Sequence, residues 1–156
     1  MTTLADSAGA WVGTNGFRLM PTDEMAEFPA TLDLRHAAGG HLTSVGYSWQ
    51  HPTDGPQEGL LTVGGADDTG RLTAIWGDSW HQQPDLMILR GTMSDAQIEL
   101  EAEYGGGGWR WQVAVAVGDD ALSLTMSNVI PDELATAESP AGPYPVMVAE
   151  LQRVAS

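Results

Sequence analysis

The sequence predicts an all-β protein: a single antiparallel up-and-down β-barrel of about ten strands, with one or two short helical turns. Apolar residues recur at every second position over many short runs, which is the period of a half-buried strand. Nineteen glycines in 156 residues supply frequent tight turns between these runs. Closing such a meander removes its two exposed edges, so we expect a barrel rather than an open sheet.

Composition limits the function classes. A formal net charge of -15 with no basic stripe argues against nucleic acid as a partner. The chain has no cysteine and all six of its cations are arginine, which excludes disulfides, thiolate metal sites and lysine Schiff bases. No apolar run is long enough for a membrane span and no signal peptide is visible, so we expect no membrane partner and a cytoplasmic location.

The first third of the chain predicts a strand, a helical turn and a hairpin. Residues 1–8 are expected to be a loose terminus, and residues 9–156 a single barrel domain. After a strand that begins at Gly9, Thr22 is placed to cap a short helical turn. The runs 30–36 and 41–51 then form a hairpin, whose four-residue turn is expected to set Leu34 opposite Thr43.

The stretch 72–81 has the most unusual pattern. If it is a strand throughout, Trp76, Asp78 and Trp80 share the inner face, while Ser79 and His81 face outward. A carboxylate between two indoles is costly to bury unless it is paired or protonated. Asp78 is therefore either a structural acid or a functional one. A catalytic triad is not expected, because Asp78 faces away from Ser79 and His81.

Short strands flank this stretch at 59–64 and 85–91. In the expected pairing with 85–91, Met87 lies beside Asp78. Leu86 and Ile88 compete with Met87 and Leu89 for the inner face of that run, so its register is the weaker one.

The second half of the chain contains the clearest hairpin, formed by 97–104 and 109–117 around four glycines. A third strand continues through 121–128, and all three agree on one apolar face. This register pairs Ala102 with Trp111, Leu100 with Val113, Val113 with Met126, and Trp111 with Asn128. It leaves Glu99, Glu101, Glu103 and Arg110 in solvent. Pro131 is placed to start a second helical turn, and 144–155 forms the last strand.

Gly9 and Trp11 near the start, with Arg153 near the end, resemble the Gly-x-Trp and distant arginine of the calycin superfamily, which includes lipocalins and fatty-acid-binding proteins. In that family the first and last strands are neighbours, and the tryptophan and arginine pack together at the closed end. The resemblance therefore implies structural roles for Gly9, Trp11 and Arg153, a calycin-like barrel and a small-molecule cavity.

The first strand also resembles that of nitrobindin-type haem barrels, matched at Gly9, Trp11 and Gly13. Asn15 stands where that pattern has glycine, and no histidine follows His81, which argues against haem at the nitrobindin site. The segments Trp-Gly-Asp-Ser-Trp-His and Asn-Val-Ile-Pro look like those of bacterial barrels of unassigned function.

Aromatic residues and a few polar groups on the inner face predict a binding site for a small hydrophobic molecule, including an aromatic one. The candidate ligand-binding residues are Tyr47, Trp49, Trp76, Asp78, Trp80, Tyr104, Trp109, Trp111, Met126 and Asn128. One alternative is an isomerase- or cyclase-type enzyme with Asp78 as its general acid or base. Another is an interaction module with a filled core. The cofactor is unknown, a homodimer is left open, and no metal site is predicted because the histidines are expected near solvated turns.

Overall fold

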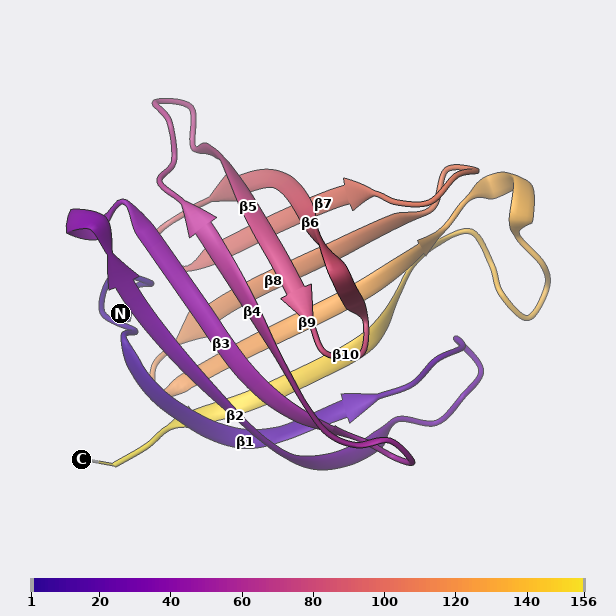
Figure 1. The fold of residues 1–156 in the computed structure, drawn as a ribbon, viewed down its shortest axis with the longest axis horizontal. Helices are drawn as coiled ribbons and strands as arrows, with labels where there is room; N and C mark the ends of the chain where they lie inside the picture. Colours follow the sequence, from indigo (N-terminus) through magenta and orange to yellow (C-terminus); the bar gives the residue numbers. More distant parts are fainter. Residues whose placement is uncertain (1, 156) are drawn as a thin grey trace.

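The computed structural model describes residues 2–155 and shows one closed barrel of antiparallel strands (Figure 1). The strands are β1 (Gly9–Phe17), β2 (Ala26–Ala37), β3 (Leu42–His51), β4 (Gly55–Gly64), β5 (Arg71–Asp78), β6 (Gln82–Met93), β7 (Gln97–Glu103), β8 (Arg110–Gly118), β9 (Ala121–Ile130) and β10 (Gly142–Arg153). Each strand pairs with the next one in sequence, and β10 returns to pair with β1. The predicted fold class is confirmed. Met1 and Ser156, which the predicted terminus and barrel domain include, lie outside the described residues.

Helical structure is limited to two short 3-10 turns, η1 (Ala38–Gly40) and η2 (Asp132–Leu134). The second one begins directly after Pro131, as predicted. The helical turn at Thr22 was a wrong prediction, because residues 18–25 form bends and turns. The Arg18 guanidinium holds this connection by donating to the backbone carbonyls of Pro21 and Pro145. No helix in the described part of the chain is long and apolar enough to cross a membrane.

Alternation places one apolar face of every strand inside the barrel, where the side chains form one continuous core. Its aliphatic members include Leu32, Leu34, Val45, Leu61, Val63, Leu89, Ile98, Leu100, Val113, Val115, Leu124, Met126, Met147 and Leu151. The predicted register of β7, β8 and β9 is confirmed, including the pairs Ala102–Trp111 and Trp111–Asn128. On the outer face Arg110 forms its ion pair with Glu101 at 2.8 Å.

Two predicted registers were wrong by two residues, although the predicted inner faces were right. Leu34 lies opposite Val45 rather than Thr43, because the turn between β2 and β3 occupies residues 38–41. Ala38 in that turn has a φ of 52°, a left-handed conformation that the pattern of apolar residues does not predict. Met87 lies opposite Trp76 rather than Asp78, because the pairing of β5 with β6 shifts between those two residues.

The pairing of β1 with β10, which we call the seam, closes the wall of the barrel, and Trp11 and Arg153 lie at one end of it. The Arg153 guanidinium lies 4.5 Å from the centre of the Trp11 ring, so the predicted contact is confirmed. Gly9 has a φ of +128°, which favours glycine, and a Cβ there would lie 3.7 Å from Arg153.

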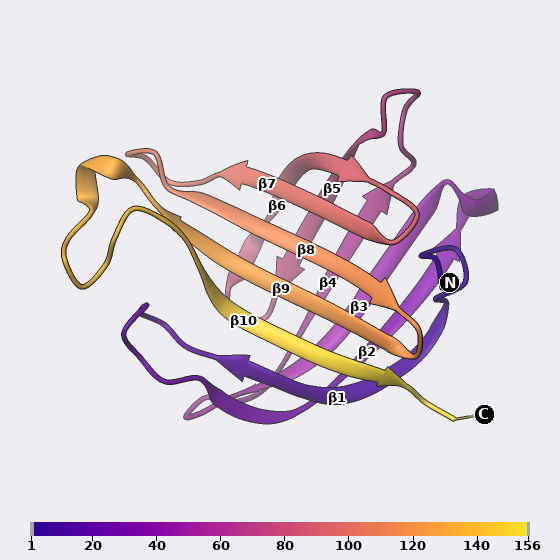
Figure 2. The ribbon, with the colours of Figure 1, turned by 180° about the vertical axis from the view of Figure 1, so that it is seen from behind.

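The segment before β1, which we expected to be loose, packs over the same end. Leu4 and Ser7 are buried there, and the Leu4 amide donates to the carbonyl of Asp95 at 2.7 Å. Both chain ends lie at this side of the barrel, next to the seam (Figure 2).

The wall at the opposite end is split between β6 and β7. These strands pair only from Arg90 to Met93 on β6 and from Ile98 to Glu101 on β7. Beyond Arg90 and Glu101 the two strands diverge, β6 following β5 and β7 following β8 (Figure 1). At this end of the barrel, β6 and β7 form no backbone pairs.

Candidate functional site

Seven rings gather inside the barrel at the end with the split, and we call them the aromatic cluster. Its members are Phe17, Trp49, His51, Trp76, Trp80, His81 and Trp111. Ring centres lie from 4.7 Å apart, between His51 and Trp80, to 6.3 Å apart, between Trp76 and His81. Aromatic pairs at such distances contribute about 0.5–1.5 kcal/mol each beyond their buried area.

A buried carboxylate fixes the geometry of this cluster. Asp78 is 5% exposed, and its two oxygens accept four hydrogen bonds from the chain itself. One oxygen accepts from the Tyr47 hydroxyl at 2.6 Å and from the Trp49 indole N–H at 3.2 Å. The other oxygen accepts from the backbone amides of Trp80 at 2.8 Å and His81 at 2.9 Å. Both oxygens are therefore engaged by donors of the chain, and no arginine pairs with Asp78 within residues 2–155.

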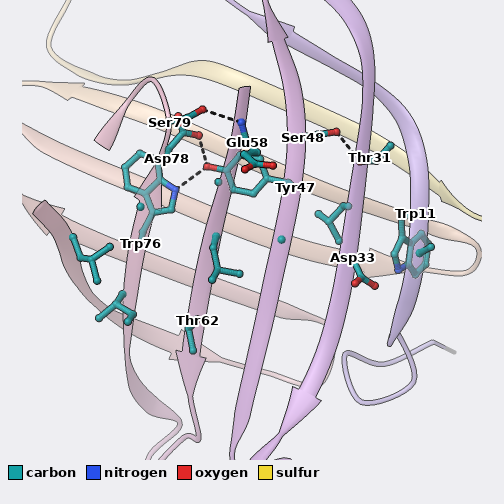
Figure 3. A pocket seen from close by; sticks show the side chains of 18 of the residues that line it. Trp11, Thr31, Asp33, Tyr47, Ser48, Glu58, Thr62, Trp76, Asp78 and Ser79 are labelled. Carbon is teal, nitrogen blue, oxygen red and sulfur yellow. Dashed lines mark hydrogen bonds between the residues drawn. The ribbon is translucent and has the colours of Figure 1, made fainter. Parts of the chain in front are cut away.

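The hydroxyl of Tyr47 connects Asp78 to Trp76. Its hydroxyl accepts from the Trp76 indole N–H at 2.8 Å while it donates to Asp78 (Figure 3). Burial and the adjacent charge of Asp78 raise the pKa of Tyr47 well above its ordinary value. The hydroxyl therefore keeps its proton and stays a donor to Asp78 throughout the neutral pH range.

His81 lies inside the barrel, which corrects its predicted outward position. The prediction extended β5 to residue 81, but the strand ends at Asp78. The Asp78 side chain accepts hydrogen bonds from the backbone amides of residues 80 and 81. The chain therefore turns at this point instead of continuing the backbone hydrogen bonds of the sheet. The alternation of faces stops at this turn. Ser79 remains outside, where its hydroxyl donates to Gln57 at 2.7 Å, so Asp78, Ser79 and His81 form no triad.

The His81 imidazole is enclosed by aromatic rings. It stacks on Trp49 with ring centres 5.1 Å apart, and its Nε2 lies 2.9 Å from the Met147 sulfur. Burial lowers the pKa of His81 to about 4; the nearby His51 adds to that shift and the charge of Asp78 opposes it. The imidazole is neutral at pH 7 for this reason.

A cavity of about 140 Å³ lies beside His81, where β6 and β7 diverge. It is lined by Trp76, His81, Gln82, Met87, Tyr104 and Trp111. Trp76 and Trp111 are stacked, with ring centres 5.4 Å apart and planes at 10°. Trp111 is 7% exposed, and its indole N–H has no hydrogen-bond partner among residues 2–155. A buried donor without an acceptor is costly, so the tryptophan wall of this cavity contains an unmet hydrogen bond.

A larger hollow of about 800 Å³ lies elsewhere, on the outer wall of β1 to β5 (Figure 3). Exposed aliphatic side chains, including Leu60, Ile75 and Leu86, line part of it. Polar side chains there bond to each other, as Thr31 does with Ser48 at 2.6 Å. We place the candidate site at the smaller inner cavity, because the inner cavity has the unpartnered donor and the aromatic rings.

The other predicted ligand-binding residues have different surroundings. The Tyr104 hydroxyl, at the cavity, donates to Asn128, whose amide donates to the Tyr144 hydroxyl at 3.4 Å. Met126 is fully buried in the core. Trp80 belongs to the aromatic cluster, and its indole N–H donates to Asp54 at 2.8 Å.

Two further predictions concern residues outside the cavity. Trp109 precedes β8, is half-buried and forms no ring pair with the aromatic cluster in the described part of the chain. His36 and His41 are exposed near the turn of the second hairpin, as expected. No three His, Asp or Glu side chains within residues 2–155 lie close enough together to bind a metal ion.

Sequence reasoning missed several residues of this end, and alternation could have found two of them. Phe17 shares its face of β1 with Trp11, and His51 shares its face of β3 with Trp49, so both belong inside. His51 is 12% exposed at its side chain, which corrects its predicted solvation. No comparable signal marked Gln82, because it directly follows the turn that Asp78 closes.

Fold and site together define a closed ten-strand antiparallel barrel with an aromatic cavity at a split in its wall. No known protein-family model matches the chain, and no curated protein matches its sequence significantly.

Proposed function

We propose that this protein binds a small, flat hydrophobic molecule in the cavity beside His81. The observation that carries the proposal is the pair of stacked tryptophans, one of which has a buried N–H without an acceptor. A ring stacked between apolar walls supplies the contacts that a flat ligand needs, and a few polar groups fix its orientation. A cavity of about 140 Å³ matches one six-membered ring, since an apolar cavity of about 150 Å³ holds benzene.

The seam supports a further part of the proposal, that the chain is a calycin relative. Trp11 and Arg153 meet across β1 and β10, and Gly9 beside them has the positive φ that favours glycine. Cavities at the mouth of such barrels commonly hold one small ligand. A cytoplasmic location stays a prediction from the sequence.

The enzyme alternative needs Asp78 to meet the ligand. Its oxygens are already engaged by four donors of the chain, and it does not line the cavity. These contacts favour a structural role for Asp78. The alternative of a filled core draws support from the small volume of the cavity, so a binding measurement must separate it from the proposal.

The test is a titration of the full chain with toluene, followed by calorimetry and by tryptophan fluorescence. We expect saturable binding at one site and a change in emission, because the cavity walls are indoles. Trp111→Phe should alter the affinity, whereas Trp109→Phe, on the same hairpin but outside the cavity, should not. Native mass spectrometry of freshly purified protein adds a search for a co-purified mass. Absence of saturable binding together with no bound mass would leave the filled-core reading in place.

A further inference from the structure

The side of β6 that faces β7 has no strand partner along the first part of its length. β6 pairs with β7 only at Arg90 to Met93, and its earlier residues pair only with β5. Apart from that pairing, no backbone hydrogen bond within residues 2–155 joins residues 82–89 to another segment. Pro84 has no N–H to donate, so we call residues 85–89, which follow it, the β6 edge.

The backbone polar groups of Ile88 point to this unpaired side. Successive residues of an antiparallel strand direct their N–H and C=O groups to opposite sides. The Met93 amide donates to the Gly70 carbonyl, before β5, whereas the Ser94 amide donates to Gln97, where β7 begins. Ile88 lies an even number of residues before Ser94, and the strand between them is regular, so its N–H and C=O face the side of β7. These two groups lack the donor and the acceptor that a neighbouring strand would supply.

The side chains of the β6 edge are apolar on both faces. Leu86 and Ile88 lie on the outer surface, where they are 59% and 63% exposed, and Met87 between them lines the inner cavity. Ile75, which pairs with Ile88 on β5, is exposed as well and extends this apolar surface. Lysine is a common protection of exposed edges, and the chain has none. Unpaired backbone and exposed aliphatic side chains therefore coincide on one strand.

Charge distinguishes between the possible occupants. Asp85 at one end of the β6 edge and Glu103 on β7, two residues past the last pair, are both exposed and form no ion pair in the described part of the chain. The net charge of -15 repels a second copy and attracts a basic segment. Arg90 at the other end of the edge directs the cations of such a segment toward Asp85.

We infer that the β6 edge is a docking site for an extended basic peptide, which adds to β6 as a further antiparallel strand. Its backbone pairs with the N–H and C=O of Ile88, as in other cases of strand addition. Alternate side chains cover Leu86 and Ile88 on the outer face, and those between them face Met87. This inference goes beyond the proposed function, because the recognising groups belong to the backbone and outer face of β6 and not to the cavity.

Amide hydrogen exchange of the full chain tests the edge without a variant. The Ile88 amide should exchange roughly tenfold faster or more than the Met93 amide, which is bonded to Gly70 at 3.0 Å. Slow exchange of the Ile88 amide in the free protein would mean that it already has an acceptor, and it would overturn the inference.

The binding test uses a synthetic peptide in which valine alternates with threonine, with blocked ends and lysines near its carboxyl end. We expect saturable binding by NMR titration, with slowed exchange of the Ile88 amide. Two control peptides carry N-methyl groups on one or the other set of alternate amides. One set should weaken binding roughly tenfold or more, because those amides face β6, and the other should not. No binding, or equal binding of all three peptides, would overturn the strand addition.

Variants of exposed residues locate the site. Ile88→Thr keeps a β-branched side chain but removes apolar contact, so the peptide should bind roughly threefold more weakly or worse. Val12→Thr, at an exposed position on β1, is the matched control and should bind as the parent does. Equal affinities of the two variants would place the peptide elsewhere and overturn the assignment to β6.

Two measurements decide the chemistry of the occupant. Glutamates in place of the peptide's lysines should weaken binding, and equal binding of the two peptides would overturn the basic partner. Sedimentation of the protein alone should show a monomer; a dimer that Ile88→Thr dissociates would assign the edge to a second copy instead. Toluene titration of the same samples reports on the cavity, so loss of peptide binding alone removes the strand addition and leaves the proposed function.

Discussion

The hydroxyl of Tyr47 and the carboxylate of Asp78 lie 2.6 Å apart, although β3 and β5, which carry them, are not neighbours in the barrel. Gly59 on β4 pairs with both residues and so lies directly between them. A Cβ at Gly59 would overlap the ring and hydroxyl of Tyr47. The missing side chain on the middle strand is what allows the two outer strands to share a hydrogen bond.

Gly59→Ala should therefore displace Tyr47 and destabilise the barrel by about 1–3 kcal/mol, the usual cost of overpacking. Gly46→Ala is the matched control: a Cβ there meets nothing closer than 3.9 Å, and stability should change by about 0.5 kcal/mol or less. Urea unfolding followed by tryptophan emission measures both. Equal stabilities of the two variants would show that Tyr47 does not need the space.

Tyr47→Phe should cost about 1–3 kcal/mol of unfolding free energy, because it removes a donor to a buried carboxylate and leaves the Trp76 N–H unpaired. Tyr144→Phe is the comparison, since its hydroxyl donates to the Leu19 carbonyl in an exposed position. The denaturant midpoints of the two variants at pH 7 measure these losses of stability. A loss no larger in Tyr47→Phe than in Tyr144→Phe would contradict the central role of Asp78.

Arg153→Ala should lower the melting temperature without changing toluene affinity, because it acts at the closed end of the barrel. Its cation–π contact with Trp11 is worth about 0.5–2 kcal/mol. Its guanidinium also donates to the carbonyls of Ala8 and Asp6. Arg35→Ala removes only an exposed ion pair with Asp33 and serves as the control. Calorimetric melting that shows no difference between the two variants would argue against the seam contact.

Stability should fall as the pH drops from about 6.5 toward 4, through His81. The pKa of this residue is about 4 in the folded chain and 6.5 in its ordinary state, so the unfolded chain binds more protons between these values. The loss amounts to about 3 kcal/mol when the whole window is crossed.

The measurement is urea unfolding at pH 7 and at pH 4.5. His81→Gln should lose distinctly less stability over this interval than the parent chain, whatever its stability at pH 7. His41→Gln, at an exposed position, should follow the parent. Parallel losses in all three proteins would mean that His81 does not change its protonation on unfolding.

The parts of the fold that sequence reasoning predicted correctly are those where alternation and turn agree. From Gln97 to Ile130 the glycine turn and the two-residue turn at Asp119 leave one register that keeps every apolar residue inside. Between β2 and β3 the face was equally clear, but a turn shifted by one residue moved the pairing by two. Alternation determines which way a side chain points more firmly than it determines which residue lies opposite.

The candidate site was predicted only in part, because alternation predicts the direction of a side chain only where the strand is regular. Trp76 and Trp111 lie on regular strands and were placed inside, where they stack. His81 was misplaced, because a hydrogen-bonding side chain interrupts the strand three residues earlier, at Asp78. An aspartate followed by a serine at a strand end is a turn signal, and it would have placed His81 beyond the strand. The split between β6 and β7 left no trace in the pattern of apolar residues.

The seam has a consequence for the time course of synthesis. Strands β2 to β9 each acquire their second neighbour when the following strand leaves the ribosome, but β1 waits for β10, the last strand of the barrel in chain order. At about 5–20 residues per second that wait lasts on the order of ten seconds. Throughout it, one edge of β1 lacks its strand partner, and unpaired edges are the usual sites of unwanted strand pairing. Arg153, at the end of β10, then contacts Trp11 near the start of β1 and stabilises the strand pairing that closes the barrel.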